Sequence, residues 1–217
     1  MMDENKHSYA GDSMRRVEDE EMITGAGCYT DDLQFPEMTH LHFVRSPYPH
    51  AKIKKMDLSA AMESEGVLAI YTADELVRDG VNPYPIPGPP GDFVTQEILD
   101  QGYRNGNGEP MDPPRWLALA KDEVRYVGQP VVAILAESAE NALTASELVE
   151  VDYKELASVG TIQDAEKESA PAIWEGAPGN LLIQMEHGDA AKTDRIFTEA
   201  DHVTELELSN SRLVGNA

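Results

Sequence analysis

The stretch that decides the fold is DEVRYVGQPVVAILAESAENALTASELVEVDY, residues 122–153. Val131–Ala136 is a short, wholly apolar run rich in β-branched side chains, which predicts a strand buried on both faces. Ser138 is suited to cap a helix over Ala139–Leu148. The alternation of apolar and polar residues in Val149–Tyr153 is typical of a half-buried strand. Strand, helix and strand over about 30 residues predict a crossover unit that supplies the core.

The helix in this stretch is expected to bury one side. At helical spacing the apolar side runs through Ala139, Ala142 and Leu143, and the small Ser146 continues the stripe. Ahead of the buried strand, Val124–Val127 is typical of a short strand, and the residues at 128–130 (Gly-Gln-Pro) indicate a turn. The stretch therefore predicts a core, and it contains no catalytic motif.

The remainder of the chain reads as short strands interrupted by short helices. Strands or edge segments are predicted at His40–Arg45, Ala51–Met56, Val67–Tyr71, Ala157–Asp164, Asn180–His187 and His202–Ser209. Helices are predicted at Ser59–Met62, after the Thr72–Glu75 capping box, and from the Asp189 cap to about Ala200. This mixed pattern favours the α+β class over a regular doubly wound sheet.

One long stretch, Val81–Pro114, has the composition of a loop. Eight of its 34 residues are proline and five are glycine, and no periodicity survives. A loop of this length inside a domain is either a functional or interaction surface, or a disordered insertion. Regular structure is predicted to resume at Trp116–Ala120, which leads into the central stretch.

The charge of the chain argues against two classes of partner. Its 40 acidic residues against 17 basic ones give a formal net charge of −23. The sequence therefore predicts binding to neither nucleic acid nor anionic lipid, because it has no basic stripe to pair with their phosphates. A solvated acidic surface that keeps the protein soluble explains the charge most simply. The more specific explanation is a salt-rich cytoplasm or a basic partner.

Cysteine content and hydropathy bear on location. Cys28 is the only cysteine in the sequence, which excludes an internal disulfide and fits a reducing compartment. The first 16 residues lack the apolar core of a signal peptide, and no apolar run approaches about 18 residues. These features predict a cytoplasmic protein with no membrane span.

Few side chains suggest chemistry, and none completes a motif. The candidates are Cys28, Asp31, Asp32, His40, His42, His187 and His202. His40 and His42 share one face of a predicted strand, but a zinc site needs further ligands, which favours core or interface histidines. Cys28 would need a histidine base to act as a nucleophile. Adjacent aspartates at 31 and 32 point to opposite faces of an extended chain, which works against joint acid–base action.

Gly25–Gly27 (Gly-Ala-Gly) could be mistaken for a dinucleotide-binding loop. Thr30 stands where that motif needs its third glycine, and no strong strand precedes it, so a simple turn is favoured. The nucleophile elbow, the phosphate-binding loop and the zinc-protease motif are likewise missing from the sequence. We therefore predict no catalytic, cofactor-binding or metal-binding residue in these 217 positions.

Several stretches together resemble one family. They are RRVEDEEMITGAGCYTDDL, HFVRSPYPHAKI, GVLAIYTADEL, LALAKDEVRYVGQPVVAILAES, ALTASELVEVDY, FTEADHV and SRLVGNA, in this order along the chain. The order is similar to that in the molybdenum-cofactor-binding large subunit of the xanthine dehydrogenase, aldehyde oxidase and carbon monoxide dehydrogenase family. The resemblance runs from about Arg15 to the C-terminus and implies the N-terminal α/β hammerhead domain. Its most specific pieces are Arg45–Ala51 and Arg125–Val131; Gln129 stands where the family often has glutamate.

The resemblance implies a structural module of an enzyme that hydroxylates an aldehyde, an N-heterocycle or carbon monoxide. The molybdenum–pterin cofactor and the catalytic glutamate would lie in sequence beyond these positions, and FAD and 2Fe–2S clusters would lie on partner subunits. The implied partners are the remainder of the large subunit or a split-gene chain, and the flavin and iron–sulfur subunits, in an oligomer. The abrupt ending after a predicted strand fits a fragment or a module completed by another chain.

The implied organisation is a frayed stretch at 1–13, a hammerhead domain at 14–160 that contains the 81–114 insertion, and a truncated start of the next domain at 161–217. Two alternatives stay open. One is a non-catalytic interaction module that keeps the fold. The other is a free-standing acidic hydrolase, which would need carboxylates converging in one pocket.

Overall fold

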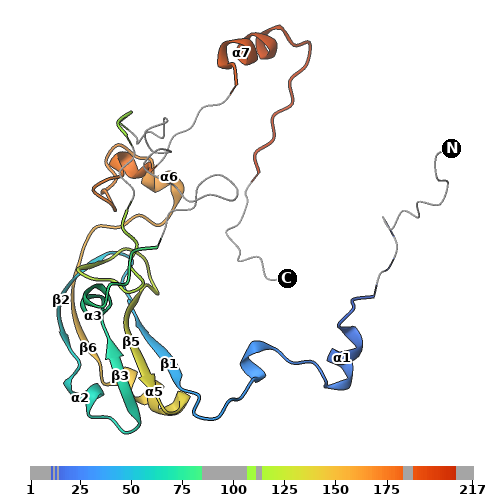
Figure 1. Cartoon of the computed structure of the whole chain (residues 1–217). Helices are drawn as coiled ribbons and strands as arrows, with labels where there is room; N and C mark the ends of the chain where they lie inside the picture. Colours follow the sequence, from blue (N-terminus) through green and yellow to red (C-terminus); the bar gives the residue numbers. More distant parts are fainter. Residues whose placement is uncertain are drawn as a thin grey trace. The chain divides into compact units, whose positions relative to one another are not determined.

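A computed structural model describes residues 11, 13, 15–84, 107–110, 114–182 and 188–208 of the chain (Figure 1). The chain divides into two compact units. The first comprises Met1–Asn82 and Leu117–Leu156, and the second comprises Pro83–Trp116 and Ala157–Ala217. Most of the predicted loop at 81–114 lies outside the described residues.

The first unit contains two three-stranded sheets. One has the strand order β1 (His40–Arg45), β5 (Pro130–Ala136), β3 (Val67–Tyr71). The other has the order β4 (Glu123–Val124), β2 (Ala51–Asp57), β6 (Glu150–Glu155). The bounds of β1 and β3 are those predicted from the sequence. The four strand pairings among the described residues are antiparallel, so the α+β fold class is confirmed.

The predicted crossover unit is wrong, although its three elements are present. β5 pairs with β1 and β3, whereas β6 pairs with β2 in the other sheet. The helix between them, α5 (Ala139–Glu147), therefore connects two sheets instead of two parallel neighbours in one sheet. Hydrophobic periodicity identifies the type of each element, but it carries no information about the strand with which it pairs.

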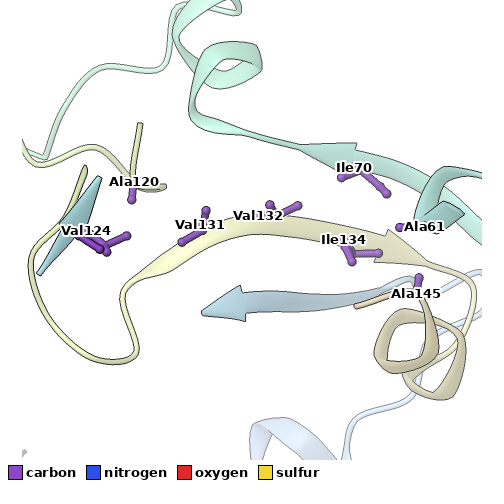
Figure 2. Close-up of a cluster of buried hydrophobic side chains, with 9 residues drawn as sticks. Ala61, Ile70, Ala120, Val124, Val131, Val132, Ile134 and Ala145 are labelled. Carbon is purple, nitrogen blue, oxygen red and sulfur yellow. The ribbon is translucent and has the colours of Figure 1, made fainter. Parts of the chain in front are cut away.

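β5 is buried on both faces, as predicted. Val132 and Ile134 are fully buried in the main core, together with Ala145 of α5 and Ile70 of β3 (Figure 2). Ala133 points to the opposite face, into a second cluster with Ala73, Leu119 and partly buried aromatic side chains. In Figure 2 Ile134 lies against Ala145, while Val131 lies at the other end of β5, near Val124 of β4. The main core therefore joins both sheets.

α5 begins as the sequence predicts, but only part of the predicted side is buried. The Ser138 hydroxyl accepts the backbone N–H of Asn141 at 3.1 Å, which caps the helix. Ala142 and Ala145 are buried, whereas the predicted core residue Leu143 is 49% exposed and Ala139 is exposed. The helix packs on β1 and β5 through small side chains. The small alanine side chains at the contact allow the helix to approach the sheet closely.

Gly66 sits where the chain enters β3 and meets α5. Its φ of +72° is in the left-handed region, and a Cβ at this position would collide with the side-chain amide of Asn141. Its carbonyl accepts the N–H of Glu137 at 2.9 Å. The predicted helical turn α2 (Ser59–Met62) ends before this glycine and buries Ala61 in the main core.

The capping box at the start of α3 (Ala73–Arg78) is present as predicted. The backbone N–H of Thr72 donates to Glu75 Oε2 at 2.8 Å, and the Thr72 hydroxyl donates to the same oxygen. These hydrogen bonds, the hydroxyl first, hold the pKa of Glu75 below its ordinary value. Thr72 is buried and α3 covers the second cluster, so the cap fixes how the helix meets the sheet.

Replacing Thr72 by alanine is expected to lower the free energy of unfolding by about 1 kcal/mol at neutral pH. Because the pKa of Glu75 is depressed in the folded state, its contribution is complete above its unfolded pKa and is lost as the pH falls through the lower folded value. Urea unfolding at pH 7 and below about pH 4 should therefore show the Thr72→Ala penalty shrinking on acidification. Thr144→Ala, at an exposed position of α5, is the control and should show no penalty at either pH. A penalty independent of pH would contradict this coupling.

Several predicted boundaries in the first unit are wrong. The segment at 116–120 forms neither helix nor strand, although Leu119 and Ala120 are buried and the Ala120 N–H donates to the carbonyl of Pro130 at 2.8 Å. The strand predicted at Val124–Val127 is β4, two residues long. An unpredicted helix, α1 (Asp19–Thr24), ends at Gly25 in the left-handed conformation, and the 3-10 turn η1 (Thr30–Asp32) follows it.

In the second unit, the Asn180 side chain ties a small lobe together. Its Oδ1 accepts the N–H of Ile173 at 2.9 Å, and its Nδ2 donates to the carbonyls of Ala165 and Pro171 at 3.1 and 3.0 Å. The lobe contains α6 (Ile162–Ala165) and the 3-10 turn η2 (Pro178–Asn180). α6 stands where an edge segment was predicted, so that prediction is wrong. The helix signal that decides it is Thr161, whose hydroxyl accepts the N–H of Asp164.

The last described elements agree only in part with the sequence predictions. α7 (Ala190–Glu199) is capped by the Asp189 carboxylate, which accepts the N–H of Lys192 at 2.9 Å, as predicted. Residues 202–208 form no strand, because an alternating pattern specifies a strand only where another strand pairs with it. Of the strand predicted at Asn180–His187, residues 180–182 are not extended in a sheet, and 183–187 lie outside the described residues.

Candidate functional site

A polar cluster at the start of β2 is the strongest candidate site in the described part of the chain. The turn between β1 and β2 is held by Ser46, whose hydroxyl accepts the backbone N–H of Tyr48 at 3.0 Å. The turn leads into His50, which is only 4% exposed. His50 Nε2 lies 2.5 Å from Glu123 Oε1, and Arg125 Nη2 lies 3.7 Å from the same oxygen. The cluster thus joins the turn before β2 to β4.

Backbone hydrogen bonds join the turn before β2 to the turn after β4. The N–H of Ser46 donates to the Gln129 carbonyl at 2.9 Å, and the N–H of Gly128 donates to the Ser46 carbonyl at 2.8 Å. The Gln129 side chain accepts the Arg125 N–H at 2.7 Å, and the Arg45 guanidinium donates to the Gly128 carbonyl at 2.9 Å. Gly128 has a φ of +87°, which favours glycine at this point of the turn.

Tyr153 of β6 packs beside this cluster. Its ring packs on Tyr48 with centroids 5.2 Å apart. Burial raises the pKa of Tyr153, and the nearby Ser46 hydroxyl offsets only part of that rise. The Tyr153 hydroxyl has no well-formed hydrogen bond to any described residue. The site is therefore a packed junction between the loops at 46–50 and 125–130 and the β4-β2-β6 sheet.

Chemically, this arrangement can position a histidine but exposes little of it. A carboxylate within hydrogen-bond distance of an imidazole nitrogen fixes the orientation of the ring. The His50 side chain is 5% exposed, so a substrate has little access to it, while Glu123 and Arg125 are about one-fifth exposed. The geometry favours a structural role, in which the cluster sets the shape of the loops at 46–50 and 125–130.

Among the described residues singled out from the sequence, His40 and His42 share one strand and the others form no common cluster with them. His40 and His42 lie on β1, opposite Ala136 and Ile134 of β5. Asp32 caps its own turn by accepting the Tyr29 N–H at 2.9 Å, and Cys28 is exposed. The other candidates are Asp31, exposed in η1, His202, exposed after α7, and His187, outside the described residues. Sequence reasoning missed His50 and Glu123, for which only the family-like stretches around them offered a signal.

Among the described residues, no three His, Cys, Asp or Glu side chains lie close enough to hold a metal ion. No described helix is long and apolar enough to cross a membrane.

The structure first gives the class of protein. It is an α+β domain with two sheets, in which a polar cluster holds the loops at 46–50 and 125–130 in place. Comparison with known proteins gives the family. Residues 24–103 and 91–157 match the family described as "Aldehyde oxidase and xanthine dehydrogenase, a/b hammerhead domain". The chain belongs to this family, and the resemblance noted in the sequence is confirmed.

The most similar proteins found include large subunits of oxidoreductases. The chain is 32% identical over 215 residues to the 6-hydroxypseudooxynicotine dehydrogenase complex subunit gamma of Paenarthrobacter nicotinovorans, covering 97% of this chain and 24% of that protein. It is 32% identical to the carbon monoxide dehydrogenase large chain of Afipia carboxidovorans, covering 89% of this chain and 22% of that protein. The chain thus spans about a quarter of the length of these relatives.

A solved structure agrees with these matches. A Cu,Mo-CO dehydrogenase in its carbon monoxide reduced state superposes with a TM-score of 0.60 at 28% identity, covering 87% of this chain and 22% of that chain. The hammerhead fold is therefore confirmed by both sequence and structure.

Proposed function

We propose that this chain is the N-terminal structural module of a molybdenum-dependent oxidoreductase large subunit. The observation that carries the proposal is the match along 97% of this chain to only 24% of a dehydrogenase subunit. Oxidative hydroxylation of an aldehyde, an N-heterocycle or carbon monoxide would belong to polypeptide outside these residues.

The same proposal extends to organisation and partners. The hammerhead domain would occupy residues 14–160, and residues 161–217 would begin the following domain. Partners would be the remainder of the large subunit, on the same or a separate chain, with flavin and iron–sulfur subunits in an oligomeric cytoplasmic complex. When bound, the molybdenum–pterin group would supply the redox chemistry. This chain would contribute the hydrogen-bonded loops at 46–50 and 125–130.

Co-purification tests the proposal. The chain is tagged and produced in its native host, the complex is isolated under gentle conditions, and its polypeptides and molybdenum content are measured. We expect a molybdenum-containing polypeptide and aldehyde- or heterocycle-dependent dye reduction in the complex, and neither in the tagged chain expressed separately. Recovery of the chain without any molybdenum polypeptide would favour the non-catalytic interaction module. Turnover by the separate chain would contradict the scaffold role.

A further inference from the structure

The segment at residues 15–39, here called the acidic arm, exposes an unusual amount of apolar side chain. No residue of the arm is buried. Its exposed large apolar residues are Val17 (94%), Met22 (39%), Ile23 (84%), Tyr29 (67%), Leu33 (44%) and Phe35 (64%). Isolated apolar residues on a surface are ordinary, but a dense series in one segment marks an interaction surface.

The backbone of the arm is organised by local hydrogen bonds. Gly25, in the left-handed conformation, ends α1, and its N–H donates to the carbonyl of Met22 at 3.4 Å. Asp32 caps η1 through the Tyr29 N–H. The hydrogen bonds of described residues 15–39 join residues within the arm itself. A six-residue helix has little stability without tertiary packing, so the arm is suited to gain its packing from a partner.

Charge narrows the identity of that partner. The arm contains seven acidic residues, Glu18, Asp19, Glu20, Glu21, Asp31, Asp32 and Glu37, and two basic ones, Arg15 and Arg16. The whole chain has a formal net charge of −23, so a second copy would repel the arm. Electrostatic complementarity favours an apolar groove that is bordered by lysine or arginine and lies outside these 217 residues.

We propose that the acidic arm docks into an apolar, basic-bordered groove on the molybdenum-binding remainder of the large subunit. This inference rests on the proposed function. In the matched dehydrogenase subunit, the region similar to this chain is continuous with the other three-quarters of the polypeptide. In that relative the remainder is therefore held at high effective concentration beside the region that matches the arm, an advantage that separate flavin or iron–sulfur subunits lack.

The test replaces the apolar contacts of the arm in the complete assembly. The tagged chain carrying Ile23→Ser, Tyr29→Ser and Phe35→Ser is co-expressed with the molybdenum-binding polypeptide of its own host. The matched control carries Met62→Ser, Leu68→Ser and Leu143→Ser, three apolar residues that are 61%, 50% and 49% exposed outside the arm. We expect at least a tenfold loss of retained molybdenum polypeptide for the arm variant and less than a twofold loss for the control. Circular dichroism and thermal unfolding of both variants check that the sheets are intact.

A second variant tests the charge argument. Glu18→Lys, Glu20→Lys and Asp31→Lys together are expected to reduce retention severalfold, and 0.5 M salt should weaken the wild-type complex. Wild-type retention by the apolar arm variant would overturn the inference, as would an equal loss in the control or loss of only the flavin or iron–sulfur subunit. If the wild-type chain retains no molybdenum polypeptide, the proposed function itself fails. The two failures are therefore distinguishable.

Discussion

Replacing Ile134 by alanine is expected to lower the free energy of unfolding by about 3 kcal/mol, within the range of about 2–5 kcal/mol for such truncations. Ile134 is fully buried at the centre of β5 and lies against Ala145 of α5 (Figure 2). β5 is hydrogen-bonded on both sides, which limits how far the surroundings can collapse into the cavity. Urea unfolding followed by circular dichroism measures the change.

The matched control for Ile134 is Leu41→Ala on the neighbouring strand β1. Leu41 is 55% exposed, so its truncation should change the free energy of unfolding by less than about 0.5 kcal/mol. A loss below about 1 kcal/mol for Ile134→Ala would contradict the placement of the core at the middle of β5. Equal losses for the two variants would contradict the assignment of Leu41 to the exposed side.

The second large effect is expected at Glu123. Glu123→Ala removes the carboxylate 2.5 Å from His50 Nε2 and 3.7 Å from the Arg125 guanidinium. A hydrogen bond involving charged groups contributes about 1.5–3 kcal/mol, so we expect a loss near 2 kcal/mol. Glu123→Gln keeps an acceptor oxygen and should lose about half as much. Unfolding experiments measure the stability, and hydrogen exchange should show faster opening of residues 125–130.

Glu150→Ala provides the control for this cluster. Glu150 is exposed on β6 in the same sheet, and its loss should cost less than about 0.5 kcal/mol. If Glu123→Ala behaved like Glu150→Ala, the cluster would not be a structural junction. If only stability fell while exchange at residues 125–130 stayed unchanged, the proposed control of loop shape would be wrong.

Local signals allowed much of the fold to be predicted from the sequence. The bounds of β1 and β3 agree with the predicted ones, the Thr72–Glu75 capping box is present, and Ser138 caps α5. Each of these features depends on neighbouring residues, either through strand composition or through a side chain that bonds to the backbone three residues away. The family resemblance was also readable, because its stretches occur in order along most of the chain.

Features that depend on distant residues were not predicted. The pairing of β6 with β2, in place of β5, depends on packing between sheets. The buried side of α5 was predicted only in part, because small alanines, and not Leu143, make the contact. The His50–Glu123 pair joins residues 73 positions apart, and nothing in the spacing of single residues indicates such a contact. The expected lack of catalytic and cofactor-binding residues stays a prediction.

The strand pairing also dictates when the protein can fold during its synthesis. β1 and β3 pair with β5, and β2 pairs with β4 and β6, so these pairings join the early part of the chain to the late part. No native sheet can close on the ribosome until Glu123 has emerged. β1, β2 and β3 emerge before it without their partner strands, so the nascent chain exposes unpaired strand edges during that interval.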